Sequence, residues 1–384
     1  MKKIIMLSLM AASAIMADPL VSYPGTKAKG MGGAFTAIAN NNSAMYFNPA
    51  GMVNFESDKA NVMFTAEVGT GGAFDLSADN IEDVTSSTFN YFVGGGITAP
   101  EYGYGVAVYS LYSVKALATD SRGTTSYKDQ DISALSASYA HALPFGLNDI
   151  YPGGGRISIG ATLGVAFSGG GLIEVESTSS DGSTSTSNYD DDTLDQLGYF
   201  GSVGIKARLY DSMLFKLDVA ANYRSSAELD SVHDDDGTTS APVNGMDMPA
   251  EVAFGVAAIY QTEYGVVTLA GDQKLTSYED ATSSENSDLH FRLNDYQTTS
   301  IGLDLSGPVY QVRGGVYTSQ EQDGNNGENL DIAGMTFGAG MILKNGSNIE
   351  FSVDNRTYKW ASGDETSEVF ASVSLNIAVQ TRAK

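Results

Sequence analysis

The chain has 384 residues, with 21 Lys and Arg against 46 Asp and Glu, a formal net charge of −25 at pH 7, and no cysteine. The lack of cysteine excludes disulfide scaffolds and thiolate chemistry. The acidic excess excludes nucleic-acid binding, whose affinity comes mainly from Lys and Arg that neutralise phosphates. Charged residues are 17% of the chain, against roughly 25% in ordinary soluble domains, while Gly (43) and Tyr (21) are frequent; this favours β-structure with aromatic girdles.

The first residues have the pattern of a secretory signal. Two lysines, Lys2 and Lys3, precede an apolar run over residues 4–12, and the small residue Ala17 stands before Asp18. We predict a cleaved signal over residues 1–17. The apolar run is shorter than the ~20 residues that a membrane-spanning helix needs, so an anchoring helix is the weaker interpretation.

Residues 18–57 follow without any apolar–polar alternation. They contain the run GMGGAFTAIA (residues 30–39) and the tetrapeptide Asn48-Pro49-Ala50-Gly51. The glycines do not match the G-x-G-x-x-G spacing of a dinucleotide loop, because Phe35 stands at the third glycine position. The segment is too polar to lie in lipid and too small to form a domain of its own.

From residue 58 onward the chain repeats segments of about 10 to 15 residues that alternate apolar with polar or small residues, as strands with two differently solvated faces do. In residues 213–224 the odd positions are all apolar or aromatic, whereas Lys216, Asp218 and Arg224 stand at even positions. We predict fourteen strands, over residues 58–70, 86–98, 103–115, 130–143, 155–167, 196–209, 212–224, 250–261, 264–276, 290–305, 308–318, 332–344, 347–357 and 366–379.

The connections between these strands alternate in kind. Tight turns are predicted at Asp211, Thr262-Glu263, Ser306-Gly307 and Asn345-Gly346, and long polar loops over residues 168–195, 225–249, 277–289 and 319–331. Short turns at one end, long loops at the other and an even strand number are typical of a bacterial outer-membrane barrel. The loops also carry acidic clusters such as residues 190–192 and 234–236; these are interpreted as a solvated surface, with a calcium site as the alternative.

The barrel offers a place for the segment 18–57. Fourteen strands enclose more space than interior side chains fill in an eight-stranded barrel, so we predict an all-β, 14-stranded antiparallel transmembrane barrel (residues 58–384) with the segment as a hatch in its lumen. Asn48-Pro49-Ala50 is predicted to hold the hatch in one position, because Pro fixes φ and Asn bonds to nearby backbone; a plain turn before the first strand is the alternative. The predicted hatch and gating residues are Gly30, Gly32, Gly33, Phe35, Asn48, Pro49 and Ala50.

The chain resembles the FadL-type outer-membrane transporters of long-chain fatty acids and other hydrophobic compounds. The resemblance rests on an ordered set of elements: residues 30–39, residues 48–51, Tyr223-Arg224-Ser225, Met248-Pro249-Ala250, Asp272-Gln273-Lys274 and Arg313-Gly314-Gly315-Val316-Tyr317. It covers nearly all of the chain after residue 17. The resemblance implies a monomeric barrel with an internal hatch, a hydrophobic ligand captured from outside, and release sideways through the wall.

Ligand capture is the chemistry that the residues favour. A carboxylate ligand needs a cation, because a buried unpaired carboxylate costs several kcal/mol, and the predicted lumen-facing candidates are Lys206, Arg224, Lys274 and Arg313. Each has an acidic residue within reach, so an ion-pair ladder along a wet lumen is the alternative. The strand around Val106, Val108 and Tyr112 is apolar on both faces, and we predict the apolar path and the wall opening there; packing against the hatch is the alternative.

No catalytic residues, metal ligands or cofactor are predicted. The three histidines, His141, His233 and His290, fall in different strands or loops, without a nucleophile at a telling offset. The leading hypothesis is a non-enzymatic, passive outer-membrane transporter for long-chain fatty acids or other hydrophobic small molecules, in contact with lipid and lipopolysaccharide and inserted by the barrel-assembly machinery. The alternatives are a secretion or surface-assembly partner and a general porin.

Overall fold

The computed structural model describes residues 23–56, 59–73, 88–119, 125–178, 184–191, 196–227, 248–277, 295–321, 330–360 and 365–380. The predicted signal over residues 1–17, the first residues of the predicted hatch and the acidic cluster at residues 234–236 lie outside these ranges. Within them, no helix is both long enough and apolar enough to span a membrane.

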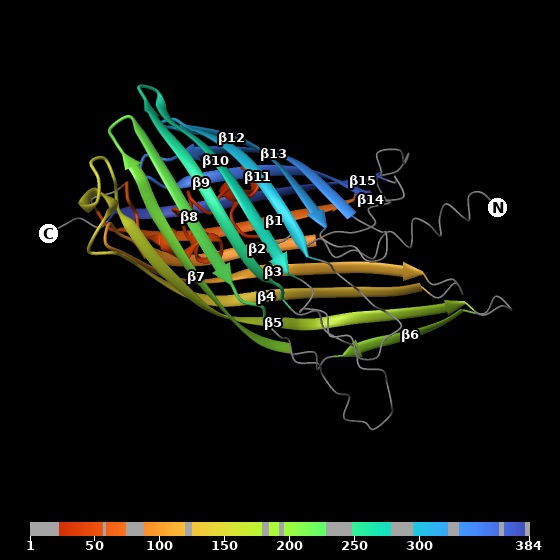
Figure 1. The fold of residues 1–384 in the computed structure, drawn as a ribbon. Coiled ribbons are helices and arrows are strands. Elements are labelled where there is room, and N and C mark those ends of the chain that lie inside the picture. Colours follow the sequence, from red (N-terminus) through yellow and green to blue (C-terminus); the bar gives the residue numbers. More distant parts are fainter. Residues whose placement is uncertain are drawn as a thin grey trace.

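The described strands form one antiparallel sheet that closes on itself (Figure 1). Strands that follow one another in sequence pair with each other except β6 and β7; β5 pairs with β7 instead, and the pairings of β4 with β5 and of β1 with β15 complete a ring of fourteen strands. The strands are β1 (Asn61–Ala73), β2 (Thr88–Thr98), β3 (Tyr102–Thr119), β4 (Thr125–Ala142), β5 (Ile157–Thr178), β6 (Thr184–Asp191), β7 (Gln196–Asp211), β8 (Phe215–Arg224), β9 (Ala250–Thr262), β10 (Gly265–Ser277), β11 (Tyr296–Ser306), β12 (Tyr310–Glu321), β13 (Leu330–Ile342), β14 (Asn348–Trp360) and β15 (Glu365–Gln380).

The prediction of a 14-stranded antiparallel barrel is confirmed, and each predicted strand has its counterpart in the ring. The prediction of residues 168–195 as one long loop is wrong in part. Strand β5 continues to Thr178, and the additional strand β6 pairs with this extension as a hairpin. Residues 171–177 continue the alternation of apolar and polar residues and include β-branched side chains. This pattern is sufficient for β5 to continue as a strand beyond the part that belongs to the ring.

The predicted tight turns are present. Gly346, in the turn between β13 and β14, has φ +85°, and Gly265, at the start of β10, has φ +147°. Both values lie in the region that residues with a Cβ rarely adopt, so glycine at these positions sets the turn geometry.

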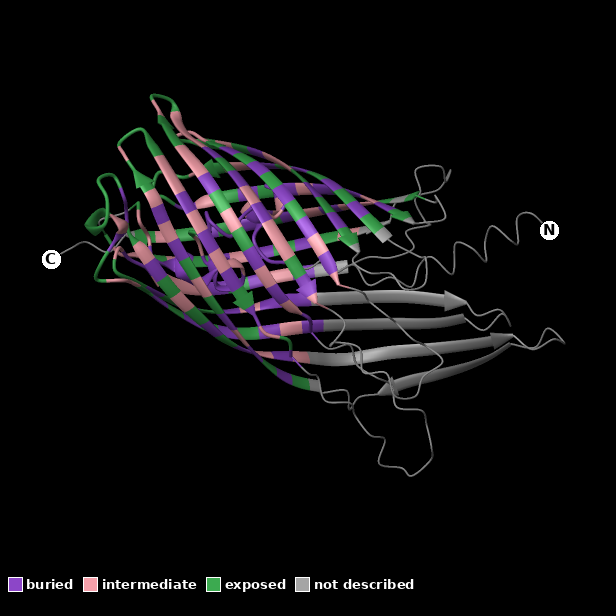
Figure 2. Ribbon diagram, in the orientation of Figure 1, coloured by how far each residue is buried: buried purple, intermediate pink, exposed green. Residues whose placement is uncertain are grey.

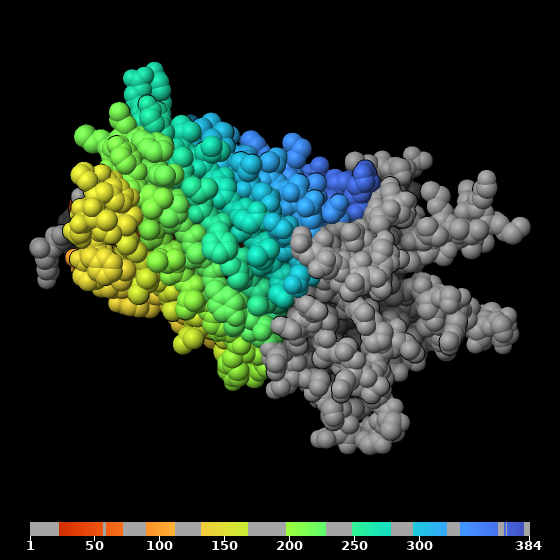
Figure 3. All heavy atoms as spheres, viewed as in Figure 1, coloured from red at the N-terminus to blue at the C-terminus, as the bar shows by residue number. Residues whose placement is uncertain are grey.

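Burial alternates along the strands (Figure 2). On β8, Asp218, Asn222 and Arg224 are buried, whereas Phe215 and Tyr223 are exposed. The same pattern recurs on β11 and β13, so polar side chains face inward and apolar side chains face outward. An apolar outer face on a closed ladder, with every strand of the ring paired on both edges, is what a membrane-spanning barrel requires. On the face shown in Figure 3, side chains cover the strands from β7 (green) to β12 (light blue).

Residues 23–56, here called the N-terminal segment, lie within the ring of strands (red in Figure 1). The segment contains two short helices, α2 (Thr26–Lys29) and α3 (Ala44–Phe47), and the 3-10 turn η1 (Pro49–Met52); a second such turn, η2 (Leu147–Asp149), lies between β4 and β5. Most apolar side chains of the N-terminal segment are buried and belong to the cluster of buried apolar residues that forms the core. The core of the protein is therefore the contact between this segment and the inner wall.

Candidate functional site

The inner wall holds the N-terminal segment through carboxylates. Glu67 on β1 is buried, and its Oε2 accepts the backbone N–H groups of Gly25 (3.0 Å) and Thr26 (2.7 Å). Its Oε1 accepts a hydrogen bond from Lys29 Nζ at 2.7 Å. One strand residue thus satisfies the donors at the start of α2 and neutralises the lysine at its end.

A second carboxylate repeats this arrangement on the opposite part of the ring. Asp272 on β10 is buried, and its Oδ2 accepts the N–H groups of Phe35 (2.8 Å) and Thr36 (2.7 Å). Hydrogen bonds to a charged acceptor are stronger than neutral ones, about 1.5–3 kcal/mol each. The middle of the segment is therefore fixed to β10.

Asn48 joins the segment to itself and to the wall. Its Nδ2 donates to the carbonyl oxygens of Thr36 and Ile205, both at 3.2 Å, and its Oδ1 accepts the N–H of Ala50 at 3.0 Å. Pro49 begins η1, and the carbonyl of Ala50 accepts a hydrogen bond from Ser158 on β5 at 2.9 Å. The Asn48-Pro49-Ala50 unit is thus a junction of three chain segments, which supports the prediction that it holds the segment in one position.

Glycines on the inner wall allow the backbones to meet. A Cβ at Gly302 on β11 would lie 2.5 Å from the carbonyl oxygen of Met31, and one at Gly255 on β9 would lie 2.8 Å from the nitrogen of Ala37. Gly30 packs against Gly338 and Arg313 in the same way. A larger residue at these wall positions would push the segment away, which explains part of the high glycine content.

Gly32 and Gly33 have a conformational role as well. Their φ values are +65° and +82°, in the left-handed region that favours glycine. They turn the chain between α2 and the anchored residues Phe35 and Thr36, and Gly33 lines the pocket described next. Phe35 is fully buried and packs edge-to-face on Phe47, with ring centroids 5.3 Å apart.

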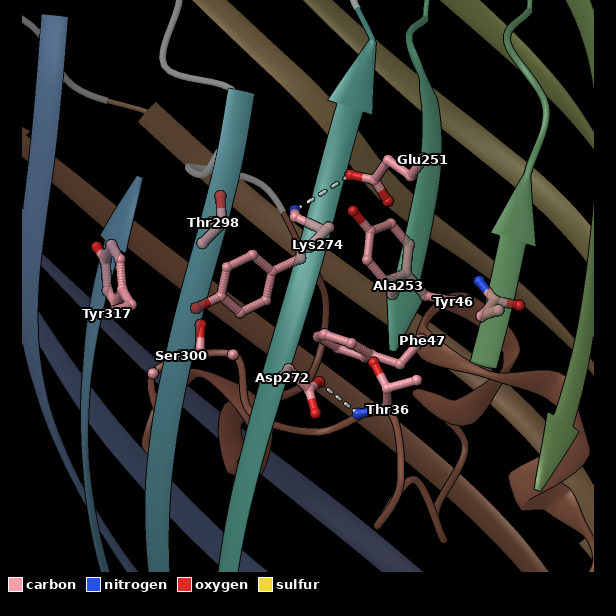
Figure 4. A pocket seen from close by; sticks show the side chains of 14 residues that line it. Thr36, Tyr46, Phe47, Glu251, Ala253, Asp272, Lys274, Thr298, Ser300 and Tyr317 are labelled. Atoms are coloured by element: carbon pink, nitrogen blue, oxygen red, sulfur yellow. Dashed lines mark hydrogen bonds and ion pairs between the residues drawn. The ribbon is translucent and has the colours of Figure 1, made fainter. Parts of the chain in front are cut away.

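A pocket lies between the segment and strands β8 to β12, with about 550 Å³ of empty space, its open mouth included (Figure 4). Thr36, Tyr46 and Phe47 of the segment face it from one side. The strands contribute Glu251 and Ala253 from β9, Asp272 and Lys274 from β10, Thr298 and Ser300 from β11, and Tyr317 from β12.

Aromatic rings continue from the pocket across the lumen. The ring of Phe47 meets those of Tyr23 (5.6 Å) and Tyr46 (5.1 Å), and Tyr46 meets Tyr109 on β3 (5.9 Å), all edge-to-face. Tyr109 in turn lies 5.8 Å from Phe92 on β2. These contacts form one aromatic series from the pocket to the wall strands β2 and β3.

Two of the predicted ligand cations meet at the pocket. Glu251 lies between them: its Oε2 is 2.6 Å from an Arg224 guanidinium nitrogen, and its Oε1 accepts from Lys274 Nζ at 3.1 Å. The Arg224 guanidinium also lies over the ring of Tyr46, 4.4 Å from its centroid, and donates to the Tyr46 hydroxyl at 3.3 Å. Both cations are therefore already partnered by an acid on the wall.

The other two predicted cations lie away from this pocket. Arg313 pairs with Asp304 (3.0 Å) and Glu350 (2.9 Å) beside Gly30. Lys206 is buried, 3.7 Å from Asp218, with its ammonium over the ring of Phe55. All four cations lie on the inner face, each within an ion pair, which favours the ion-pair ladder for Arg313 and Lys206.

The two described residues of the predicted apolar path on β3, Val106 and Val108, lie on the outer face of the wall. Val106 is 59% exposed on the outer face, and Val108, two residues further, is half-buried on the same face. The inner face of this strand presents Ala107 and Tyr109 instead. The side chain of Tyr112 lies outside the described part of the structure.

The ladder between β2 and β3 is short. Pairing runs from Thr98–Gly103 to Phe92–Tyr109 and stops there, although β2 begins at Thr88 and β3 continues to Thr119. Beyond this point the N–H of Tyr91 donates to the side chain of Ser110 (3.1 Å), and a register shift follows between Ser110 and Tyr112 on the β4 side. The two strands therefore separate next to the aromatic series that ends at Tyr109 and Phe92.

His141, the one histidine among the described residues, is not in an arrangement typical of a catalytic residue. His141 stacks on Tyr139 at 6.4 Å, and Tyr139 is exposed on the outer face. His233 and His290 lie outside the described residues. Among the described residues, no cluster of His, Asp and Glu has the arrangement of a metal site.

Several residues of this site had no role assigned from the sequence. Glu67 and Glu251 anchor or line it, yet each is an isolated acid in an alternating strand, indistinguishable there from any other lumen-facing acid. Asp272 belonged to the family resemblance without a role of its own; the available signal was a carboxylate at an inward position of a strand that has no other acid. Tyr46 and Phe47 could not be assigned, because nothing local shows which side of α3 meets the wall.

Comparison with protein-family models found no match, and comparison with curated protein sequences found none. Solved structures do match. The monoaromatic hydrocarbon channel CymD has a TM-score of 0.61 and 13% identity, covering 97% of this chain and 100% of its own. The toluene transporter TbuX of Ralstonia pickettii has a TM-score of 0.60 and 13% identity (92% and 97% covered), and a FadL homologue of Pseudomonas aeruginosa has 0.55 and 12% (93% and 98%). The chain therefore has the fold of the FadL-type outer-membrane barrels.

Proposed function

We propose that this protein is an outer-membrane channel through which hydrophobic small molecules pass without energy input. The observation that carries the proposal is the pocket between the N-terminal segment and strands β8 to β12, from which an aromatic series leads to the wall at β2 and β3. The solved structures of the same fold include channels for monoaromatic hydrocarbons and toluene transporters. No catalytic role is proposed.

The outer surface supports the location. Exposed Leu, Val, Phe and Tyr side chains occupy the outward positions of the barrel strands, so lipid is the environment in which this face is stable. We propose that residues 1–17 direct export as a cleaved signal, and that the barrel is inserted by the assembly machinery and works as a monomer. Lipopolysaccharide and phospholipid are then its surroundings.

Residues 18–57 are proposed to act as a hatch. The described part of this segment is buried inside the ring and fixed at Glu67, Asp272 and Asn48, so an axial path for water and ions is obstructed. A general porin needs an open lumen, and this alternative is therefore disfavoured. A ligand that enters the pocket needs another exit.

The exit is proposed to lie between β2 and β3. The ladder between these strands ends at Phe92 and Tyr109, where the aromatic series from the pocket reaches the wall. A hydrophobic ligand could pass from Tyr46 to Tyr109 and leave sideways into the bilayer, where apolar surface is stabilised. The proposed substrates of this route are hydrophobic small molecules, with long-chain fatty acids and aromatic compounds as the two candidate classes.

Uptake by cells that lack a transporter of their own tests the pocket. Ala253→Phe places a ring in the pocket and should abolish uptake of every hydrophobic substrate. Ala258→Phe, the same change on the outer face of β9, is the matched control and should leave uptake unchanged. A wild-type protein that folds in the membrane and takes up no hydrophobic compound would refute the proposal and favour the surface-assembly partner.

A cross-link tests the lateral exit, and the chain has no native cysteine to interfere. A disulfide between Tyr91→Cys and Ser110→Cys bridges the strands just beyond their last pair. It should block uptake until a reductant is added. The pair Val93→Cys and Val108→Cys lies within the existing ladder and should have no effect. Equal uptake by both oxidised variants would exclude release between β2 and β3.

A further inference from the structure

The side chains around the pocket are of an unexpected kind for a hydrophobic route. Four aromatic residues, Tyr23, Tyr46, Phe47 and Tyr317, provide its apolar surface. Among the described residues that line it there is no Leu, Ile, Val or Met, and the only aliphatic side chain is that of Ala253. An alkyl chain in this pocket would find little aliphatic surface, whereas an aromatic ring can pack edge-to-face against these rings.

The remainder of the lining is polar. Thr36, Thr298, Ser300 and Asn222 contribute hydroxyl and amide groups that both donate and accept hydrogen bonds. Thr298 and Ser300 are inward neighbours on β11, buried at the same side of the pocket (Figure 4). Thr298 and Asn222 already form hydrogen bonds with Ser319 and Ser202, both at 2.9 Å, but a hydroxyl or amide group has capacity for a further hydrogen bond. A ligand without polar groups would cover that remaining capacity, whereas a hydrogen-bonding ligand can use it.

The charges around the pocket already balance. Lys274 and Arg224 both pair with Glu251, and Asp272 supplies a second carboxylate that holds the backbone of Phe35 and Thr36. Two cations thus stand beside two anions, and a ligand carboxylate would be a third anion without a cation of its own. The pocket therefore disfavours fatty acids and aromatic acids.

Lys274 can serve a neutral ligand. An ammonium group has three N–H donors, and its hydrogen bond to Glu251 uses one of them. A hydroxyl group on the ligand can accept from Lys274 and donate to Thr298, which is opposite Lys274 on β11, or to Ser300, the next inward residue, which is opposite Asp272. Such a group matches both the donors and the acceptors of the lining.

We propose that the pocket selects uncharged aromatic compounds that carry a hydroxyl group, phenols as a chemical class, over aromatic hydrocarbons and over carboxylates. This inference rests on the proposed channel function and names the substrate class of the same site. The ring is held by the aromatic residues, and the hydroxyl group by Lys274 and the β11 side chains.

Binding to the purified protein in lipid nanodiscs tests the selection, with three probes that share one ring and one alkyl group: 4-propylphenol, propylbenzene and 4-propylbenzoate. At equal free concentration, 4-propylphenol should bind about 3–10-fold more tightly than propylbenzene, as one or two neutral hydrogen bonds would give. The benzoate should bind most weakly. Equal affinities for the phenol and the hydrocarbon, or tightest binding of the benzoate, would overturn the inference and leave the channel proposal intact.

A matched pair of variants separates hydrogen bonding from shape. The double variant Thr298→Val and Ser300→Ala removes both inward hydroxyls, and should reduce the preference for the phenol about threefold or more without weakening propylbenzene. Thr299→Val, on the outer face of the same strand, should keep the preference. A preference that survives the double variant overturns the inference. Failure of all three probes to bind the folded wild type, with Ala253→Phe indistinguishable from it, would instead overturn the proposed function.

Discussion

Removal of the Glu67 carboxylate should release the start of the N-terminal segment. In Glu67→Ala the N–H groups of Gly25 and Thr26 lose their acceptor, and Lys29 loses its partner at 2.7 Å. Each buried N–H left unpaired costs about 1–3 kcal/mol, so the two together cost about 2–6 kcal/mol of docking free energy. The undocked population should then rise about 30-fold or more.

Single-channel conductance in planar bilayers measures this release, because an undocked segment leaves the lumen open. Glu67→Ala should show open events of larger size or higher frequency than the wild type. Glu67→Gln keeps one oxygen for the two N–H groups but loses the charge that pairs with Lys29, and it should fall between them. Val68→Ala, on the outer face of the same strand, is the control and should behave as the wild type.

The barrel itself should remain folded in all three variants, because β1 keeps its ladders to β15 and β2. Heat-modifiable gel mobility checks this. If Glu67→Ala inserts as a folded barrel and conducts as the wild type does, the carboxylate does not hold the segment, and the reasoning from the buried N–H groups is refuted.

Three further predictions concern other parts of the molecule. Val219→Arg places a charge on the outer face of β8 and should cost about 2–4 kcal/mol at mid-membrane depth, measured by folding titrations into liposomes against Val219→Ala; equal stability of the two would mean that this face does not meet lipid. Asn48→Ala removes three hydrogen bonds at the junction of the segment and should change substrate uptake more than barrel stability; the opposite ranking would assign Asn48 to the barrel fold alone. Burial raises the pKa of Glu56, but its ion pairs with Lys216 and Arg208 outweigh this and lower the pKa below the usual 4.5. The stabilisation is therefore present above pH ~4.5 and is lost as pH falls through the lowered pKa. The thermal unfolding temperatures of the wild type and of Glu56→Gln should accordingly converge in acid. A difference between the two temperatures that stays constant from pH 7 to pH 3 would contradict the ion pairs.

The alternation of residue types alone was sufficient to predict the barrel. In residues 213–224 the polar side chains recur at every second position, and a strand is the conformation that puts them all on one face. Tight turns, such as the one at Asn345-Gly346, and long polar loops then indicated at which end of the barrel each connection lies. The hairpin of β5 with β6 was missed, because its pattern continues a strand beyond the ring and nothing local marks where a ring ends.

The sequence by itself determined that the chain is a 14-stranded barrel, that a non-alternating segment precedes it, and which side chains share a face, because these properties depend on short-range periodicity. Only the tertiary structure decided which residues form the site. The anchoring of Phe35 by Asp272 and the junction of Asn48 with Ile205 join positions 237 and 157 residues apart. Such contacts depend on where the ring closes and on how closely glycines let the segment approach the wall, and no local pattern encodes either of these.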